Sequence, residues 1–341
     1  MPVPRVIGVD LGGTKLLAGA VDPDLGIHHR VQRSVTGLDQ QALLDVAVQA
    51  VTDTIAAVTT PIEAVGFGIP VLIDRGTGRA VVGVNTLLHD IAFAEVMSQR
   101  LGLPVFVDND GNCAALAEHR AGACRGCSEA IVMTLGTGIA GGLILRDEIY
   151  RGALGAAGEL GHMVIEFDGP PCHGNCPNHG CAEVYVSGTA LVQEARWLAQ
   201  TRPGSGLARA LGSARVISGP VITELAEAGD ESAIEAITLI GSRLGVVLAN
   251  LINIFNPQVI AIGGGVIAAG ELLLSPARAV VAERVLPFLT EGVEIVATRF
   301  GVEAGMVGAA ALAYDQLARA AATPRTSGSG STSSVDDPTG G

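Results

Sequence analysis

Hydrophobic residues along this chain fall into short runs that end at glycines or polar residues. Residues 5–22 (RVIGVDLGGTKLLAGAVD) place apolar arms on either side of a glycine turn, which predicts two strands joined by that turn. Two further apolar runs, residues 64–74 and 103–110, end at glycine or polar positions in the same way. Runs of this length between turn residues are typical of buried strands.

Longer stretches have the spacing of amphipathic helices. Residues 40–58 and 234–251 each carry an apolar stripe at helical intervals, and residues 112–123 are predicted to form a helix directly after a polar triplet. Residues 258–265 are predicted to be a strand that runs into a glycine turn. The low-complexity stretch 323–341 is predicted to be disordered. With many glycines and few aromatics, the pattern indicates an α/β protein.

The first hairpin pattern recurs later in the chain. Residues 131–146 (IVMTLGTGIAGGLILR) align with residues 7–22 at a constant offset of 124, so that Gly12 meets Gly136. A duplicated domain with two facing glycine turns would give this pattern. Chance similarity between two glycine hairpins is the alternative.

Composition and charge narrow the classes of function. With 48% hydrophobic residues the chain can build a large core, and a formal charge of −13 excludes a general nucleic-acid binder because nothing neutralises phosphates in bulk. An anionic nucleotide can still bind locally through backbone N–H groups and a metal. The N-terminus lacks the pattern of a signal peptide. Residues 244–270 are apolar enough for a membrane span, but they carry asparagines, a proline and three consecutive glycines, so we interpret them as buried core. We therefore expect a cytoplasmic protein without a membrane partner, whose cysteines are reduced or metal-bound.

The sequence DLGGTK at residues 10–15 has the features of a phosphate-binding turn. Gly12 and Gly13 let backbone N–H groups approach an oxyanion, while Thr14 adds a hydroxyl donor and Lys15 a positive charge. Asp10, at the end of the first strand, is the candidate to orient hydrated Mg²⁺.

Two other glycine turns strengthen the case for a nucleotide. Thr137 and Gly138 lie in the second hairpin turn, and Gly264 and Gly265 follow the strand at 258–263. Two hairpins can grip a polyphosphate from two sides, and the third turn leaves room for a planar base against the backbone. Each glycine taken alone is also explained by ordinary turn geometry.

The triplet DND at residues 108–110 ends one predicted strand and opens a helix. Ligand chemistry in α/β proteins gathers at the carboxyl ends of strands, so Asp110 is the candidate general base. Asp108 leaves the strand on its other face and is the weaker candidate. The aspartates can also serve as helix caps, and both roles are compatible.

A cysteine-rich stretch, residues 159–183, predicts a closed zinc site. Cys172, Cys176 and Cys181 supply three thiolates, and three histidines in the stretch compete for the fourth position. We favour His162, because a histidine inside so short a loop is strained for ligation. A cysteine-rich surface loop without metal is the alternative. A four-ligand zinc would be structural, pinning the ELGH segment against the CAE segment.

Such a pin has a consequence for the two glutamates at the ends of the stretch. It would bring Glu159 and Glu183 together, although they are distant in sequence. Two fixed carboxylates beside a base suit a polyol, whose hydroxyls need paired hydrogen bonds. A second cysteine pair, Cys124 and Cys127, is either a redox CxxC or a plain surface turn, and its surroundings favour the turn.

The motifs DLGGTK, VDNDGNCAALAE, LGTGIAGG, GELGH and GCAEVYVSGTAL, in this order, resemble the ROK family of sugar kinases and repressors. The resemblance covers residues 5–320 and is strongest to the family's bacterial glucokinases. It implies an actin-like, ribonuclease-H-like fold of two α/β domains that close over the sugar. The implied domains are a smaller one at 1–119, onto which helix 306–322 packs back, and a larger one at 120–305 that carries the zinc loop.

The resemblance also assigns roles to residues. It makes Asp110 the general base and has Asn109, Glu159, His162 and Glu183 bind sugar hydroxyls. Asn85 is expected to help shape the sugar pocket. The implied zinc ligands are His162 with the three cysteines.

Two positions depart from the family pattern. Gly174 stands where the family has its first knuckle cysteine, so Cys172 must replace that ligand, and Val71 replaces a family glycine.

The predicted activity is ATP-dependent phosphorylation of glucose at the 6-hydroxyl, with Mg²⁺ on the phosphates. Kinases of other hexoses (N-acetylmannosamine, N-acetylglucosamine or fructose) and polyphosphate as the donor are alternatives with the same machinery. A sugar-sensing protein without catalysis is the alternative from another class. The resemblance further implies a homodimer or homotetramer.

Overall fold

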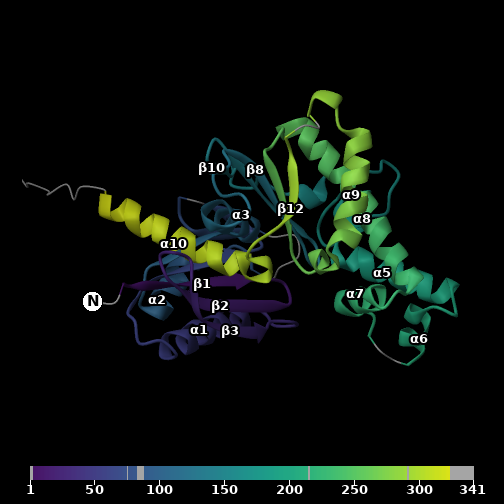
Figure 1. The fold of residues 1–341 in the computed structure, drawn as a ribbon. Helices are drawn as coiled ribbons and strands as arrows, with labels where there is room; N and C mark the ends of the chain where they lie inside the picture. The colour runs from purple at the N-terminus through teal and green to yellow at the C-terminus, as the bar shows by residue number, and fades with distance from the viewer. Residues whose placement is uncertain (1–2, 75, 83–87, 214–215, 290–291, 323–341) are drawn as a thin grey trace, which may run out of the picture.

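The structure is a computed structural model that describes residues 3–74, 76–82, 88–213, 216–289 and 292–322 (Figure 1). It has the expected α/β architecture, with two five-stranded sheets and helices packed against them. Asn85 and the tail at 323–341 lie outside the described residues.

The N-terminal sheet has the strand order β3-β2-β1-β4-β7. Its first hairpin forms because two apolar arms flank the turn at residues 12–15, and Leu11 pairs with Leu16 across it. β4 and β7 then pair in parallel beside β1, as strands joined through helices do. The strands are β1 (Arg5–Leu11), β2 (Lys15–Val21), β3 (Ile27–Ser34), β4 (Ile62–Ile69) and β7 (Val105–Asn109). A short separate hairpin joins β5 (Leu72–Asp74) to β6 (Arg79–Val82).

The second sheet has the order β10-β9-β8-β11-β12, so it repeats the topology of the first strand for strand. This repeat agrees with the internal similarity in the sequence. The pairing corrects one detail, because Leu135 pairs with Ile139 and the second turn is one residue shorter than the first. The offset of 124 therefore holds for the first arm and becomes 123 in the second. The strands are β8 (Glu129–Leu135), β9 (Ile139–Leu145), β10 (Glu148–Tyr150), β11 (Val259–Gly263) and β12 (Glu294–Ala297).

Helices begin and end where the sequence supplies capping residues. Asp39 caps the first helix, and Asn256 at a left-handed φ of 45° ends the longest one directly before Pro257. The α-helices are α1 (Gln40–Ala56), α2 (Phe93–Leu101), α3 (Asp110–Ala121), α4 (Glu183–Val186), α5 (Gly188–Thr201), α6 (Gly206–Gly212), α7 (Gly219–Glu227), α8 (Glu231–Phe255), α9 (Glu271–Arg284) and α10 (Ala304–Ala322). Short 3₁₀ turns are η1 (Leu160–His162), η2 (Val266–Ala269), η3 (Pro287–Leu289) and η4 (Gly301–Glu303).

Helix α8 accounts for the apolar stretch that the sequence raised as a membrane question. By length and composition α8 could cross a membrane, but 56% of its most apolar window is buried inside the protein. It packs along α9 and also contacts α5 and α7 in the largest hydrophobic core. The burial explains its hydrophobicity through packing within the fold.

Two helices join the sheets. In Figure 1 the yellow α10 runs across the purple N-terminal sheet, with α3 on its other side. Glycines permit this approach. A Cβ at Gly8 in β1 would lie 1.9 Å from the carbonyl oxygen of Met306 in α10, and a Cβ at Gly308 in α10 would lie 1.6 Å from the carbonyl oxygen of Cys113 in α3. Helix α10 thus packs on β1 and β4. The division of the chain at residue 119 stays a prediction, since α3 contacts strands of both sheets.

Candidate functional site

The polar triplet lies at the junction of β7 and α3, where the strand ends directly in the helix. Asn109 is the N-cap, and its side-chain oxygen accepts hydrogen bonds from the backbone N–H groups of Gly111 (2.9 Å) and Asn112 (3.4 Å). Asp110 is the first helical residue, so α3 begins two residues earlier than predicted. Since an amide can cap the helix, the Asp110 carboxylate is not needed for that role.

Asp110 lies in an environment that suits a base working near neutral pH. The pKa of its carboxyl is raised to about 6, chiefly by burial and also by the negative charge of Glu159, while a backbone hydrogen bond from the Gly111 N–H lowers it. Such a group is mostly ionised at pH 7 yet basic enough to accept a proton.

Asp10 lies near the end of β1, close enough to Asp110 for their charges to interact. The pKa of Asp10 is raised to about 7, chiefly by burial and also by the charge of Asp110, while the charge of Lys15 lowers it. The first turn is closed by a hydrogen bond from the Gly12 N–H to the Lys15 carbonyl (2.9 Å), and the Lys15 side chain begins at the exposed end of β2. A cavity lined by Asp10, Lys15 and Arg30 opens beside this turn. Two carboxylates that repel each other at a turn lined with donors can accommodate a divalent cation, which would relieve the repulsion.

The second and third glycine turns lie against each other. The Gly136 N–H donates to the Gly138 carbonyl (2.9 Å) and so closes the second turn. Gly264 has a φ of 82°, and a Cβ there would lie 2.4 Å from the carbonyl oxygen of Leu135, so only glycine fits. Thr137 is anchored through its carbonyl by the Thr189 hydroxyl (2.7 Å). The turn residues expected to face a nucleotide are thus brought together at the carboxyl ends of β8 and β11.

The structure gathers the cysteine and histidine side chains that the sequence assigned to a metal. One ligand atom from each of His162, Cys172, Cys176 and Cys181 lies within 4.8 Å of the other three. His162 Nδ1 is 3.5 Å from Cys172 Sγ, and the sulfurs of Cys176 and Cys181 are 4.0 Å apart. Zn–S and Zn–N bonds of about 2.3 and 2.1 Å in a tetrahedron produce separations of this size. The donor set therefore fits Zn²⁺.

The other two histidines of the loop point elsewhere. His179 Nδ1 is 3.3 Å from the carbonyl oxygen of Gly169, and His173 Nδ1 is 3.8 Å from the Glu183 carboxylate. With Nδ1 of His162 facing the sulfurs, its Nε2 lies 3.9 Å from Glu159. His162 can thus hold a metal through one nitrogen and offer the other to a ligand.

Glu183 is a buried carboxylate with one oxygen unused. Its side chain is 5% exposed, and Oε2 accepts a hydrogen bond from the Ile139 N–H (2.8 Å). Oε1 is buried without a hydrogen-bond partner among the described residues. His173 Nδ1 lies 3.8 Å from Oε1, too far for a hydrogen bond, so Oε1 can accept a hydrogen bond from a ligand, as buried carboxylate oxygens normally accept one. Gly138 lies directly beside this carboxylate, and a Cβ there would be 2.3 Å from Oε2.

Glu159 lies close enough to both Glu183 and Asp110 to interact with their charges. Burial raises the pKa of Glu159, the charge of His162 lowers it, and the charge of Glu183 raises it. The four carboxylates therefore form a series, in which Asp10 neighbours Asp110, Asp110 neighbours Glu159, and Glu159 neighbours Glu183. Glu159 and Glu183, at the two ends of the cysteine-rich stretch, thus interact through their charges.

The remaining cysteine pair has the geometry of a turn. The Cys127 N–H donates to the Cys124 carbonyl (3.2 Å), and Cys124 is fully buried while Cys127 is partly exposed. Burial raises the pKa of Cys124 to about 12, which is unfavourable for a reactive thiolate. The interpretation as a turn is consistent with these contacts.

The sequence interpretation missed one ion pair in this region. Arg151 follows β10, and its guanidinium reaches the Asp108 carboxylate at the end of β7. The only signal in the sequence was the alternation of side chains along β7, which separated Asp108 from Asp110. Nothing in the sequence indicated that an arginine 43 residues away would meet it.

Comparison with known proteins identifies close relatives of the whole chain. Residues 6–316 match the model of the ROK family. A glucokinase of Thermotoga maritima is 34% identical over 93% of this chain and 99% of its own length. A crystal structure of a ROK family glucokinase from Streptomyces griseus, in complex with glucose and AMPPNP, superposes with a TM-score of 0.84 at 35% identity over 91% of this chain and 99% of its own. A xylose repressor of Bacillus spizizenii is 29% identical over 91% of this chain and 77% of its own length.

Proposed function

The chain belongs to the ROK family, and on this premise we propose that it is a glucokinase, which transfers the γ-phosphoryl group of ATP to the 6-hydroxyl of glucose. The observation that carries the proposal is the series of carboxylates. Asp110 interacts through its charge with Asp10, on the first glycine hairpin, and with Glu159, which in turn interacts with the buried Glu183. A base in this position has both a candidate phosphate-binding turn and candidate hydroxyl acceptors in its surroundings.

We propose that Asp110 accepts the proton of the sugar hydroxyl. As the hydroxyl oxygen forms its bond to the γ-phosphorus, the bond from that phosphorus to the β–γ bridging oxygen breaks and ADP leaves. The O–H proton passes to the Asp110 carboxylate, whose pKa of about 6 suits the transfer. Most of the rate enhancement then comes from positioning and charge stabilisation, as in other phosphoryl transfers.

Around the base, the proposed sugar contacts divide between the two ends of the zinc loop. Glu183 Oε1 has a free acceptor position, and Glu159 with His162 Nε2 lies beside it. Asn109 uses its side-chain oxygen as the helix cap, so its amide N–H₂ group is available to a hydroxyl oxygen. The role expected for Asn85 stays a prediction.

On the nucleotide side, we propose that the glycine turns cradle the phosphates. Gly12, Gly13, Thr14 and Lys15 supply donors in the first turn. The others would come from the second and third turns, namely Thr137, Gly138, Gly264 and Gly265. Asp10 would hold Mg²⁺, which when bound neutralises phosphate charge.

The cluster of one histidine and three cysteines supports a structural Zn²⁺, because four protein ligands would leave no coordination position open. Its proposed task is to fix the loop that carries Glu159 and Glu183. An isolated bridge between Val164 and Cys181 already joins the two ends of this loop.

A donor and acceptor panel tests the activity. Purified protein is assayed for ADP release with glucose, N-acetylmannosamine, N-acetylglucosamine and fructose, and with polyphosphate in place of ATP. The proposal expects the highest kcat/KM for glucose with ATP. If another hexose has the highest kcat/KM, that hexose replaces glucose as the proposed substrate. If polyphosphate alone supports turnover better than ATP, polyphosphate replaces ATP as the proposed donor. Tight glucose binding without turnover of any sugar would identify a sugar-sensing protein instead.

Substitution of the base tests the mechanism. Asp110→Asn should lower kcat by at least about 100-fold, since a missing general base costs roughly this much, while glucose still binds. Asp24→Asn is the matched control, because Asp24 is exposed in the turn before β3. Near-normal turnover by Asp110→Asn would eliminate Asp110 as the base.

Three further features stay predictions of this proposal. We expect a homodimer or homotetramer, a cytoplasmic location, and no nucleic-acid or membrane partner. Light scattering on the purified protein measures the oligomeric state directly.

A further inference from the structure

The ion pair between Arg151 and Asp108 joins the two sheets beside the proposed base. Asp108 is the fourth residue of β7, at the edge of the N-terminal sheet, and Arg151 directly follows β10, at the edge of the second sheet. Arg151 Nε and Nη2 lie 2.7 and 2.6 Å from Asp108 Oδ2. The side chains are only 16% and 10% exposed, so solvent screens the pair weakly.

The Asp108 carboxylate is also tied to the start of α3. Its Oδ1 accepts hydrogen bonds from the Asn109 N–H (2.8 Å) and from the side-chain amide of Asn112 (3.0 Å). Asn109 and Asn112 lie on either side of Asp110, one before the helix and one in its first turn. A displacement of Asp108 would therefore be transmitted to the backbone that carries the base.

The arginine is fixed on its own side as well. Arg151 Nη1 donates to the Ile149 carbonyl (3.1 Å), and the Arg151 carbonyl accepts from the Ala157 N–H (3.1 Å). The second bond closes the loop that leads to Glu159. The pair thus connects the segment of the base with the segment of a proposed sugar-binding carboxylate.

We propose that the Arg151–Asp108 pair is a positioning device that holds the first turn of α3, and with it Asp110, in register with the 151–159 loop. This inference rests on the proposed function for its catalytic consequence. Neither residue touches the reacting atoms, so both act through Asp110. Because glucose has other contacts, loss of the pair should reduce kcat more than the affinity for glucose.

The test compares Arg151→Met, Arg151→Lys and the double variant Asp108→Asn/Arg151→Met with the wild type. Arg151→Met should lower kcat on the order of 100-fold, as a misplacement of about 1 Å does, with a much smaller change in the glucose Kd. Arg151→Lys should restore part of kcat, because a single ammonium replaces the two guanidinium contacts. The double variant should be more active than Arg151→Met, since it leaves no unpaired buried charge.

Arg120→Met is the matched control. Arg120 lies in α3 and likewise forms an ion pair, with Asp315 of α10, but this pair is more exposed and lies at the far end of the helix from Asp110. Its loss should change kcat by no more than about twofold, as exposed pairs contribute little.

Hydrogen exchange separates this inference from the proposed function. In Arg151→Met, amide exchange should accelerate at residues 109–113 and 151–159 together, whether or not the enzyme turns over glucose. If the wild type has no kinase activity but Arg151→Met still shows this linked acceleration, the proposed function is refuted and the positioning role is retained. Unchanged exchange in both segments, or equal losses of kcat and thermal stability in Arg151→Met and Arg120→Met, would overturn the inference.

Discussion

At the scale of single residues, the site depends on carboxylates that are kept close together despite their charge. Asp110 is the central one: the charge of Glu159 disfavours its ionised form, and its own charge disfavours the ionised form of Asp10. Removal from water is the largest cause of the raised pKa of Asp110, so the fold tunes this residue by burying it. The same burial makes its protonation state sensitive to pH near neutrality.

The pH dependence of the reaction follows from this shift. The base must be ionised to accept a proton, and its pKa in the folded protein is raised from 3.8 to about 6. We therefore expect kcat/KM for glucose to be constant above pH 7 and to fall as the pH drops through about 6, tenfold per unit once below it. A pH–rate profile at saturating ATP measures this limb. An acidic limb near pH 4 would show that Asp110 is not shifted or is not the base.

At the scale of elements, the glycine hairpins and the zinc loop differ in what fixes their conformation. The hairpins present backbone donors at strand ends, which their local sequence already specifies. The zinc loop has little regular structure and is held by isolated bridges at its base, so a metal would contribute much of its rigidity.

Replacement of the least expected ligand tests this loop. Cys172→Ser should lower zinc affinity by more than about 100-fold and weaken glucose binding, because Glu159 and Glu183 lose their common support. Zinc is measured by mass spectrometry after dialysis against a chelator, and glucose binding by calorimetry. Cys127→Ser, outside the cluster, and His179→Ala, whose ring faces the Gly169 carbonyl, should both retain zinc. Full zinc content in Cys172→Ser would assign the position of Cys172 in the zinc site to another residue.

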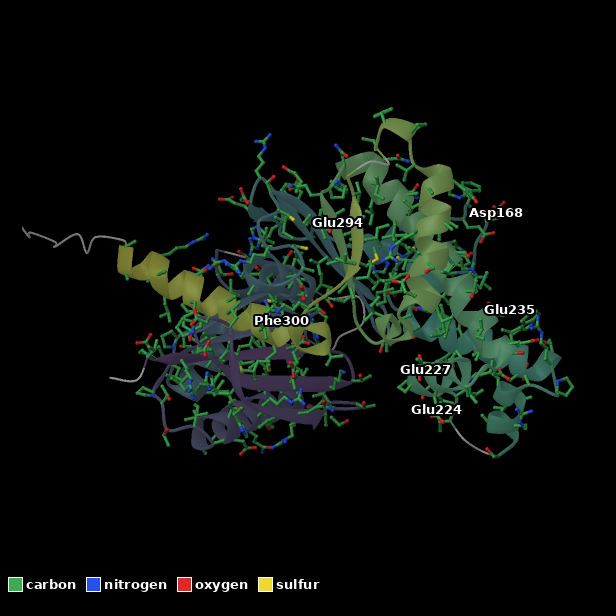
Figure 2. All side chains as sticks on the ribbon, viewed as in Figure 1. Asp168, Glu224, Glu227, Glu235, Glu294 and Phe300 are labelled. Carbon is green, nitrogen blue, oxygen red and sulfur yellow. The ribbon has the colours of Figure 1, made fainter. Side chains whose placement is uncertain are left out.

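At the scale of the whole molecule, two repeated sheets are joined by the crossing of α3 and α10. Glu118, buried in α3, secures this crossing by accepting hydrogen bonds from the N–H groups of Ala123, Arg299 and Phe300. Figure 2 shows Phe300 where the chain passes from β12 towards α10. The helices themselves meet through small residues, which brings their backbones into contact.

This close contact predicts a large effect from a single methyl group. Gly308→Ala would place a Cβ 1.6 Å from the Cys113 carbonyl oxygen, so the helices must separate. We expect the free energy of unfolding to fall by about 3 kcal/mol, at the upper end of the usual cost of overpacking. Gly204→Ala is the control, because a Cβ there meets nothing within 4 Å. Urea unfolding of both variants measures the difference, and equal stability would show that α10 and α3 can move apart freely.

The sequence by itself determined the local elements and most of the candidate site. Glycine turns, apolar strands and the α8 stripe follow from contacts between residues near in sequence, and the spacing of Cys172, Cys176 and Cys181 is a local property too. The choice of His162 over His173 and His179 could be argued from loop strain before any coordinates.

Tertiary structure alone decided what depends on distant segments meeting. The Arg151–Asp108 pair, the hydrogen bonds from the Arg299 and Phe300 N–H groups to Glu118 and the shifted pKa of Asp110 all arise where elements far apart in sequence pack together. Burial and long-range charge are properties of the packed molecule, so no local pattern encodes them. The shorter second hairpin shows the same limit, because only strand pairing reveals which residues of the two arms are equivalent.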